Sequence, residues 1–224
     1  PLPPVTTLND AVRDGAPQLH DEAPNNVCLD FQMGDADATA KAFEAAAHVT
    51  KVHLDNNRVF VSAMEPRAAI ADFDTDDDRY ILHVCSQGVM GMRNTLAGAI
   101  FNVEPEKIRV FTSDVGGSFG MKAMPYHEYP VIMLAAKQLG RPVKWTADRS
   151  ESCVSDHQGR ASQFEAELAL DKDGKFLAAR VTGLADMGGY LTGTGPLAQS
   201  VNIGKNLPCM YTTPTIDVNM RCVF

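Results

Sequence analysis

The sequence predicts an α+β fold in which mixed or antiparallel sheets pack against helices. Stretches with helical periodicity and stretches with strand-like alternation are interleaved along the 224 residues, but they do not repeat as regular β-α-β units. Apolar residues make up 45% of the chain, which is sufficient for a hydrophobic core. The irregular order of helices and strands favours α+β over a doubly wound parallel sheet.

The first part of the chain is expected to contain a linker, a helix and an antiparallel meander. Residues 1–34 are rich in Pro, Asp and Asn, and we expect them to form a linker-like segment from a preceding domain. A helix is expected over residues 38–48, with Asp35 or Asp37 as its N-cap. Strand-like alternation then predicts a meander with strands at residues 49–54, 59–63, 68–73 and 80–85.

Two longer helices flank a short strand in the middle of the chain. The first helix is expected over residues 89–101, the strand over 108–112, and the second helix over 126–139, where Gly140 ends it. The predicted buried face of the first helix consists of Met92, Leu96, Ala99 and Ile100. The predicted buried face of the second consists of Val131, Leu134, Ala135 and Leu139.

The last part of the chain is predicted to be mainly β-structure. A short strand at 143–145 is followed by a polar connection at 148–156. Residues 164–170 and 176–184 alternate on either side of a turn that contains Gly174, which predicts a hairpin. The final forty residues are expected to be loop-rich up to a strand near Val218.

The charge distribution excludes two classes of partner. The formal net charge is −8, and the chain has no run of Lys and Arg, so neither nucleic acid nor an anionic membrane surface is expected to be the main partner. The densest acidic run, residues 72–78, is predicted to be a solvated hairpin turn. No apolar run is long enough to cross a bilayer, so we expect no membrane insertion.

Cysteine usage and the chain ends suggest the setting of the protein. An odd number of cysteines without C-x-x-C spacing favours reduced thiols over a zinc site or a disulfide framework, and hence a cytoplasmic protein. These cysteines are Cys28, Cys85, Cys153, Cys209 and Cys222. The chain opens at Pro1 and stops at Phe224 within an apparent strand, so we expect a piece of a longer polypeptide.

A glycine-rich loop at residues 114–122 is the strongest candidate for a functional site. Glycine and serine at 116–118, together with Gly120, let the backbone adopt positive φ and leave its N–H groups free to approach a ligand. A second unusual segment, residues 85–88, also follows an apolar strand. The two strand ends are therefore predicted to converge on one site.

Two other functions remain open from the residues alone. Residues 116–120 satisfy the G-x-S-x-G pattern of α/β-hydrolases, which would make Ser118 a nucleophile with Asp148 and His157 as partners. Against this hydrolase alternative, the residues after Ser118 look like continued loop, and the parallel-sheet alternation is missing. The second alternative is a non-catalytic interaction domain.

Several segments together resemble a known enzyme family. The combination is similar to the molybdenum-binding large subunit of the xanthine dehydrogenase, aldehyde oxidase and carbon monoxide dehydrogenase family, and it spans nearly the whole chain. The similar segments are Ser86-Gln87-Gly88, residues 114–122, Gly140-Arg141-Pro142-Val143-Lys144-Trp145, Asp148-Arg149-Ser150-Glu151, Met64-Glu65-Pro66-Arg67 and the opening Pro1-Leu2-Pro3-Pro4-Val5.

The resemblance implies roles for particular residues. Gln87 would donate a hydrogen bond to an oxygen ligand of molybdenum, a task that suits an uncharged amide. The implied contacts to the cofactor come from Gln87, Gly88, Gly116, Gly117, Phe119 and Gly120, and no residue of this chain is a direct metal ligand. Ser118 replaces the third glycine of the usual G-G-G-F-G pattern, a small change that we expect to be tolerated if its side chain points away.

The resemblance also implies an activity and its requirements. The family hydroxylates small molecules with water as the oxygen source, using a molybdopterin that we expect as a cytosine dinucleotide, with iron–sulfur clusters and FAD on partner subunits or domains. Residues 35–224 would be the first part of the molybdenum-cofactor domain. The glutamate that serves as general base lies outside this chain, so the piece is expected to be inactive without the rest of the large subunit. Ala123 stands where purine-oxidising members have glutamate, so an aldehyde or carbon monoxide is at least as plausible a substrate as a purine.

Overall fold

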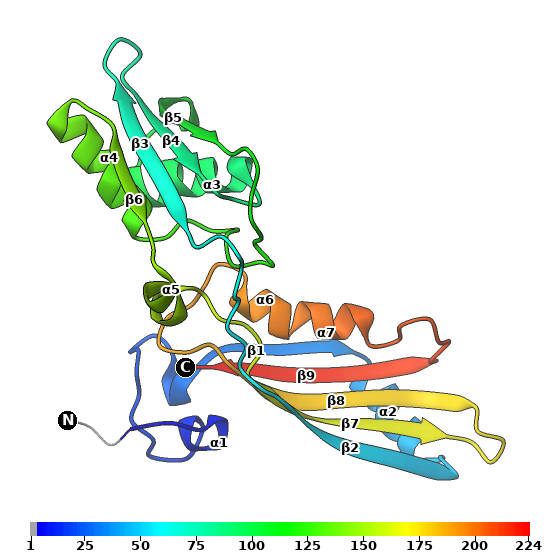
Figure 1. Cartoon of the computed structure of the whole chain (residues 1–224). Coiled ribbons are helices and arrows are strands. Elements are labelled where there is room, and N and C mark those ends of the chain that lie inside the picture. Colours follow the sequence, from blue (N-terminus) through cyan, green and yellow to red (C-terminus); the bar gives the residue numbers. More distant parts are fainter. Residues whose placement is uncertain (1–3) are drawn as a thin grey trace. The chain divides into compact units, whose positions relative to one another are not determined.

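The computed structural model describes residues 4–224, which form two compact units (Figure 1). Unit 1 is built from the chain up to Val59 and again from Gly159 to Phe224, and unit 2 from Phe60 to Gln158. The first three residues of the Pro-rich opening lie outside the described range. No helix of the described residues is long and apolar enough to cross a membrane.

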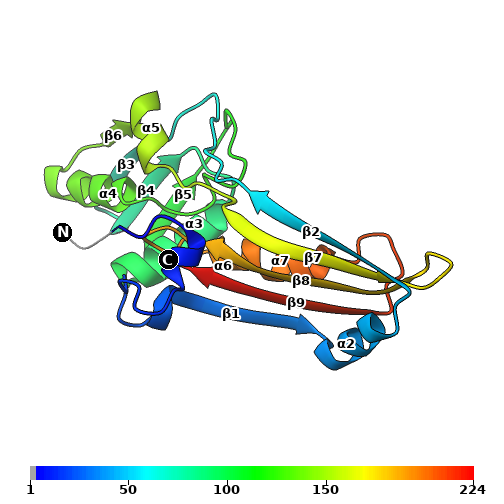
Figure 2. The ribbon, with the colours of Figure 1, turned by 90° about the horizontal axis from the view of Figure 1, so that it is seen from below.

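Unit 1 is a five-stranded sheet with the strand order β1-β9-β8-β7-β2, and its strands lie side by side in Figure 2. The strands are β1 (Val27–Gly34), β2 (His48–Asn56), β7 (Ser162–Leu170), β8 (Phe176–Asp186) and β9 (Thr215–Val223). Only the β8–β9 pair is parallel. The helices of this unit are α1 (Leu8–Ala11), η1 (Pro24–Asn26), α2 (Ala36–Glu44), α6 (Gly195–Gln199) and α7 (Val201–Asn206).

Alternation along the strands gives this sheet one apolar face. Val218 and Met220 of β9 are buried on that face, and Ile203 of α7 packs against them. Arg180 of β8 points to the opposite face, because successive strand residues alternate and Val181 belongs to the apolar core. The guanidinium of Arg180 lies 4.4 Å from the ring of Phe43 in α2. Helices therefore cover parts of both faces.

Unit 2 is a four-stranded sheet with the order β5-β4-β3-β6, in which only β4 and β5 are parallel. The strands are β3 (Ala68–Asp74), β4 (Arg79–Val84), β5 (Ile108–Phe111) and β6 (Val143–Thr146). The helical segments are α3 (Val89–Thr95), the π-helical η2 (Leu96–Phe101), η3 (Pro105–Lys107), α4 (Glu128–Leu139) and α5 (Arg149–Ser155). Mixed sheets with packed helices confirm the predicted α+β class.

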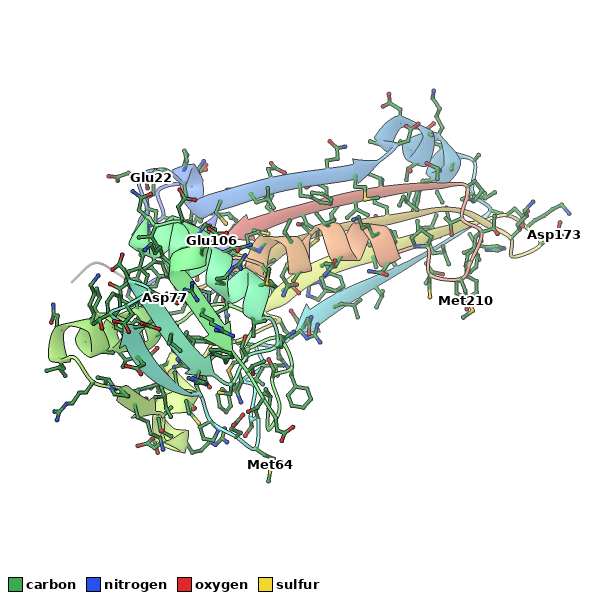
Figure 3. All side chains as sticks on the ribbon, turned by 90° about the horizontal axis from the view of Figure 1, so that it is seen from above. Glu22, Met64, Asp77, Glu106, Asp173 and Met210 are labelled. Atoms are coloured by element: carbon green, nitrogen blue, oxygen red, sulfur yellow. The ribbon has the colours of Figure 1, made fainter. Side chains whose placement is uncertain are left out.

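Several predicted elements are present. Asp35 caps α2, where its carboxylate accepts a hydrogen bond from Ala38 N at 2.9 Å. β3 and β4 pair across the acidic turn that contains Asp77, whose label marks the end of this hairpin in Figure 3. β7 and β8 form the second predicted hairpin. The assignment of residues 1–34 to a linker stays a prediction, although the structure places β1 at the end of this segment.

Other predicted elements are wrong. β2 does not join a meander with β3, because it pairs with β7 in the other sheet. The strand expected at 59–63 is reduced to one bridge between Val59 and Gly159. The polar connection at 148–156 contains α5, and the loop-rich final part contains α6 and α7. These errors reflect long-range pairing and short helices, neither of which periodicity detects.

The predicted buried faces of two helices also need correction. In α4 the buried residues are Tyr129, Ile132, Met133 and Ala136. The predicted stripe instead faces outward, with Val131 63% and Leu139 57% exposed. In the earlier helix Met92 and Leu96 are buried as predicted, but Ala99 and Ile100 are exposed, Ile100 by 46%. The helix widens to π geometry from Leu96, which shifts the inward positions by one residue.

Candidate functional site

The candidate site lies in unit 2, where two adjacent strands end. β4 ends at Val84 and is followed by the segment containing Gln87, while β5 ends at Phe111 and is followed by the glycine loop. Because β4 and β5 are parallel neighbours, their carboxyl ends meet at the same edge of the sheet. Ser86 N donates to Thr112 Oγ1 at 3.3 Å, which ties the two strand ends together. The predicted convergence of the two segments is thus present.

Gln87 is held against the glycine loop through one end of its amide. Gly120 N donates to Gln87 Oε1 at 2.9 Å, and the Ser118 hydroxyl donates to the same oxygen. The main chain adds a contact from Gln87 N to Lys122 O at 3.3 Å. The Gln87 side chain is otherwise exposed. The structure therefore brings together Gln87, Ser118 and Gly120, and the Ser118 hydroxyl is occupied by contacts within the protein.

The loop has an unusual backbone that presents an aromatic side chain. Gly117, Phe119 and Gly120 have φ of +103°, +52° and +95°. Phe119 is therefore a bulky residue in the left-handed region, a conformation that is uncommon outside glycine. Its side chain is 80% exposed. The ring lies against Gly117, where an added Cβ would come within 2.9 Å of it, whereas an added Cβ at Gly88 or Gly120 would meet no atom within 4 Å.

Gly116 has a different role from Gly88 and Gly120. A Cβ added at Gly116 would lie 2.5 Å from the Cβ of Glu65, so packing inside the protein already requires glycine there. Glu65 N in turn donates to Gly116 O at 3.1 Å. Gly116 thus contributes to the site by letting the loop lie against the segment that contains Glu65.

Glu65 and Lys122 form an ion pair beneath the loop. The Lys122 side chain is fully buried, and its Nζ lies 2.7 Å from Glu65 Oε2. The same oxygen accepts Gly116 N at 2.9 Å. Burial alone would raise the pKa of Glu65, but the hydrogen bonds from Lys122 and Gly116 outweigh burial and hold this pKa below its ordinary value. Glu65 is therefore ionised at neutral pH and clamps both ends of the loop.

A second buried charge holds the segment that follows Glu65. Arg67 donates to Glu128 of α4 at 2.9 and 3.1 Å and to Asp156 after α5 at 2.5 Å. Its guanidinium lies 3.6 Å from the centre of the Tyr126 ring. Met64, before Glu65, is 92% exposed and projects from the ribbon in Figure 3. The chain around Glu65 is therefore fixed by buried charges, while Met64 stays accessible.

The arrangement around Ser118 does not match a serine hydrolase. Ser118 Oγ contacts Gln87 Oε1 and Lys122 N. Asp148 instead caps α5 by accepting Glu151 N at 2.7 Å, and the ring of His157 stacks on Tyr126 at 4.3 Å. The three residues that would form the triad thus make unrelated contacts. No helix begins at Ser118 either, because the next one starts at Glu128.

Sequence reasoning missed the supporting residues of the site. Glu65 and Lys122 were noted only as part of similar segments, and Ser118 only as a replaced glycine. A lysine two residues after the last glycine of the loop offers a weak signal, because a buried ammonium group requires a carboxylate. The partner lies 57 residues away in sequence, so spacing alone does not identify it. Within residues 4–224, no three His, Cys, Asp or Glu side chains gather as a metal-ligand set.

Comparison with known proteins gives a consistent result. The sequence model of the molybdopterin cofactor-binding domain family matches residues 19–224. The chain is 30% identical to the carbon monoxide dehydrogenase large chain of Hydrogenophaga pseudoflava, an alignment that covers all of this chain and 29% of that protein. It is also 30% identical to the nicotine 6-hydroxylase large subunit of Paenarthrobacter nicotinovorans, over 79% of this chain and 21% of that protein.

Solved structures agree with these relatives. A Cu,Mo-CO dehydrogenase in its carbon monoxide reduced state superposes with a TM-score of 0.86 at 28% identity, over 100% of this chain and 29% of that one. Quinoline 2-oxidoreductase from Pseudomonas putida 86 superposes with a TM-score of 0.87 at 28% identity, over 99% of this chain and 28% of that one. The chain thus spans less than a third of the length of these relatives. It belongs to the molybdopterin cofactor-binding domain family.

Proposed function

We propose that this chain is part of the large subunit of a molybdenum hydroxylase, an oxidoreductase that oxidises a small molecule with water as the oxygen source. The observation that carries the proposal is the Gln87 amide, whose oxygen is tied to the glycine loop while its Nε2 end is exposed. The relatives named above, which include a carbon monoxide dehydrogenase and a nicotine hydroxylase, support this reaction class. The substrate class is an aldehyde, an N-heterocycle or carbon monoxide.

The residues present fit a molybdenum cofactor. Gln87 Nε2 would donate a hydrogen bond to an oxygen ligand of the metal, and Phe119 and Gly120 would contact the cofactor through the loop backbone. Gly88 and Gly120 would leave room for its approach, because an added Cβ at either position would meet no atom within 4 Å. The chain supplies orientation and hydrogen bonds, while the bound cofactor supplies the two-electron redox chemistry. The metal would be carried by the pterin, with no side chain of this chain as a direct ligand.

The proposed enzyme needs components beyond this chain. We propose that residues 35–224 are the first part of the cofactor domain, that residues 1–34 link it to a preceding domain, and that the general base lies in the rest of the large subunit. The chain alone would then be inactive. The pterin would be a cytosine dinucleotide, electrons would leave through iron–sulfur and FAD partners, and the complex would be cytoplasmic.

Metal analysis of the complete complex tests this proposal. The full-length gene product is purified with its co-purifying subunits from cells that make the cofactor, and molybdenum and pterin are measured against protein. We expect both in equimolar amounts in the complex and neither in residues 1–224 alone. A complex without molybdenum would overturn the proposal and favour a non-catalytic interaction domain.

A variant pair locates the site within the complex. Gln87→Ala is expected to lower hydroxylase turnover about 100-fold or more, because oxyanion-type hydrogen bonds are commonly worth about 2.7–4 kcal/mol in a transition state. Gln138→Ala serves as a control, since Gln138 is an exposed glutamine on α4. Equal turnover in the two variants would contradict the role of Gln87. Esterase activity that disappears in Ser118→Ala would instead support the hydrolase.

A further inference from the structure

We propose that Ser118 is a positioning residue that fixes the Gln87 amide with its nitrogen directed outward. The effect on catalysis rests on the proposed function. The hydrogen bonds around Ser118 are present in this structure whichever function is correct. It replaces the expectation that serine at this position is a neutral substitute for glycine. Three hydrogen bonds, taken in order, support it.

The first hydrogen bond identifies the atoms of the Gln87 amide. The oxygen and nitrogen of an amide are commonly assigned from their neighbours. Here the neighbour is the backbone N–H of Gly120, which can only donate, and the amide atom 2.9 Å away must therefore be the acceptor Oε1. Nε2 is then the free end of the amide. It carries two N–H donors and no acceptor, so it can bind only an electron-rich atom.

The other two hydrogen bonds set the direction of the Ser118 hydroxyl. Lys122 N donates to Ser118 Oγ at 3.1 Å, so the hydroxyl hydrogen is available for Gln87 Oε1. The donors thus run in one direction, from Lys122 N–H through the Ser118 hydroxyl to the Gln87 carbonyl. Each bond in such a chain polarises the next, which makes the amide N–H groups better donors.

The series of hydrogen bonds begins at Lys122, a residue that is anchored in the protein interior. The Lys122 side chain is fully buried and paired with Glu65, and Lys122 O accepts the Ser86 hydroxyl at 3.2 Å. Gln87 itself is exposed, and a free glutamine side chain would populate several rotamers. With glycine at position 118, Oε1 would keep only the bond from Gly120. Ser118 therefore transfers the rigidity of the buried Lys122 segment to an exposed amide.

The test uses the full-length complex with Ser118→Ala, Ser118→Thr and the control Ser150→Ala, an exposed serine of α5. Crystal structures of the complex, with and without cofactor, report the Gln87 conformer. We expect Ser118→Ala to show several Gln87 conformers, whereas Ser118→Thr and Ser150→Ala keep the single conformer of the parent protein. If Ser118→Ala does not fold, Ser118→Gly removes the same hydroxyl group.

Two further readouts connect the conformer to function. Turnover in Ser118→Ala is expected to fall about fivefold with KM unchanged, which corresponds to one neutral hydrogen bond of about 1 kcal/mol. The electron paramagnetic resonance spectrum of the molybdenum centre should shift in Ser118→Ala and return in Ser118→Thr. A merely structural role would not give that pattern of loss and rescue.

The outcomes separate this inference from the proposed function. A parent complex that holds no molybdenum would overturn the hydroxylase proposal. The Gln87 conformers in the variants would still show whether Ser118 positions the amide. A single unchanged conformer in Ser118→Ala, with an unchanged spectrum, would overturn the positioning role even in an active hydroxylase. Failure of Ser118→Thr to restore the parent conformer would also overturn it.

Discussion

The ammonium group of Lys122 is fully buried and depends on Glu65, whose side chain is 36% exposed. This asymmetry predicts unequal effects of removing either partner. Glu65→Gln leaves a buried cation uncompensated and is expected to lower the free energy of unfolding by about 3 kcal/mol, the lower end for a broken buried pair because water reaches Glu65. Lys122→Met is expected to cost less, since the remaining carboxylate is partly hydrated.

Trp145 provides the measurement for this pair. It is the only tryptophan of the chain and lies in β6 of unit 2, so its fluorescence during urea unfolding reports on that unit. The double variant Glu65→Gln with Lys122→Met should recover part of the loss. If Glu65→Gln unfolds at the same urea concentration as the parent, the Glu65–Lys122 ion pair makes no contribution to stability.

His157 predicts a pH dependence of the stability of unit 2. Burial, followed by the charge of Arg67, holds the pKa of His157 below its ordinary value of 6.5. Between the lowered value and 6.5, the unfolded chain binds the proton more readily than the folded one. The contribution of His157 is therefore complete above pH 6.5 and is lost as the pH falls through the lowered pKa. Urea unfolding followed by Trp145 should show lower stability at pH 5.5 than at pH 7.5.

Two variants isolate this effect. In His157→Phe the stacking on Tyr126 is retained, and the decrease between pH 7.5 and 5.5 should become smaller. His53 is the control, because the hydrogen bond with Glu165 raises its pKa and it lies in unit 1. His53→Gln should leave the Trp145 transition unchanged. An equal decrease in His157→Phe and the parent would show that another group is responsible.

At the scale of the element, α4 provides a matched pair of apolar residues. Ile132 faces the core and is 7% exposed, whereas its neighbour Val131 is 63% exposed. Ile132→Ala is expected to lower the free energy of unfolding by about 2–4 kcal/mol through lost burial and a residual cavity. Val131→Ala should change it by less than about 0.5 kcal/mol. If Val131→Ala loses more stability in urea unfolding than Ile132→Ala, the buried face predicted from the sequence is the correct one.

The same helix shows what sequence patterns can and cannot define. Periodicity predicted α4 and its end at Gly140, which adopts the left-handed conformation. It could not choose the buried face, because α4 is apolar on both sides. For α5 a signal was present but not used: Asp148 and Glu151 have the spacing of a capping box, and Asp148 caps the helix.

The site was only partly predictable for a related reason. Gln87, Gly88 and Gly120 lie in segments that follow strands, so the positions of the strand ends predicted that these segments come together. The role of Ser118 depends on a contact with Gln87, 31 residues away, and that of Glu65 on a contact with Lys122, 57 residues away. Such pairings depend on how segments distant in sequence come together in space. Local sequence patterns contain no information on that arrangement.

At the scale of the whole molecule, the chain leaves unit 1 at Val59 and returns at Gly159. These two residues exchange backbone hydrogen bonds of 2.9 Å in both directions, so the ends of the intervening segment are close in space. Unit 2 also has its own hydrophobic core. Segments with neighbouring ends and their own core commonly fold alone. We expect residues 60–158 to fold when expressed separately.

Urea unfolding of this segment, followed by circular dichroism and Trp145 fluorescence, checks the expectation. Both signals should change in one cooperative transition. Leu82→Asp places a charge at a fully buried position and should abolish that transition. A gradual, non-cooperative change in the parent segment would show that unit 2 needs unit 1 to fold.

The central claim is that Gln87 and the glycine loop contact the molybdenum cofactor. The most direct measurement is an electron cryo-microscopy structure of the complete, cofactor-loaded complex. The account predicts an oxygen ligand of the metal within hydrogen-bond distance of Gln87 Nε2, with the backbone of Phe119 and Gly120 against the cofactor. A cofactor bound elsewhere, with Gln87 and the Phe119 ring still facing solvent, would contradict it.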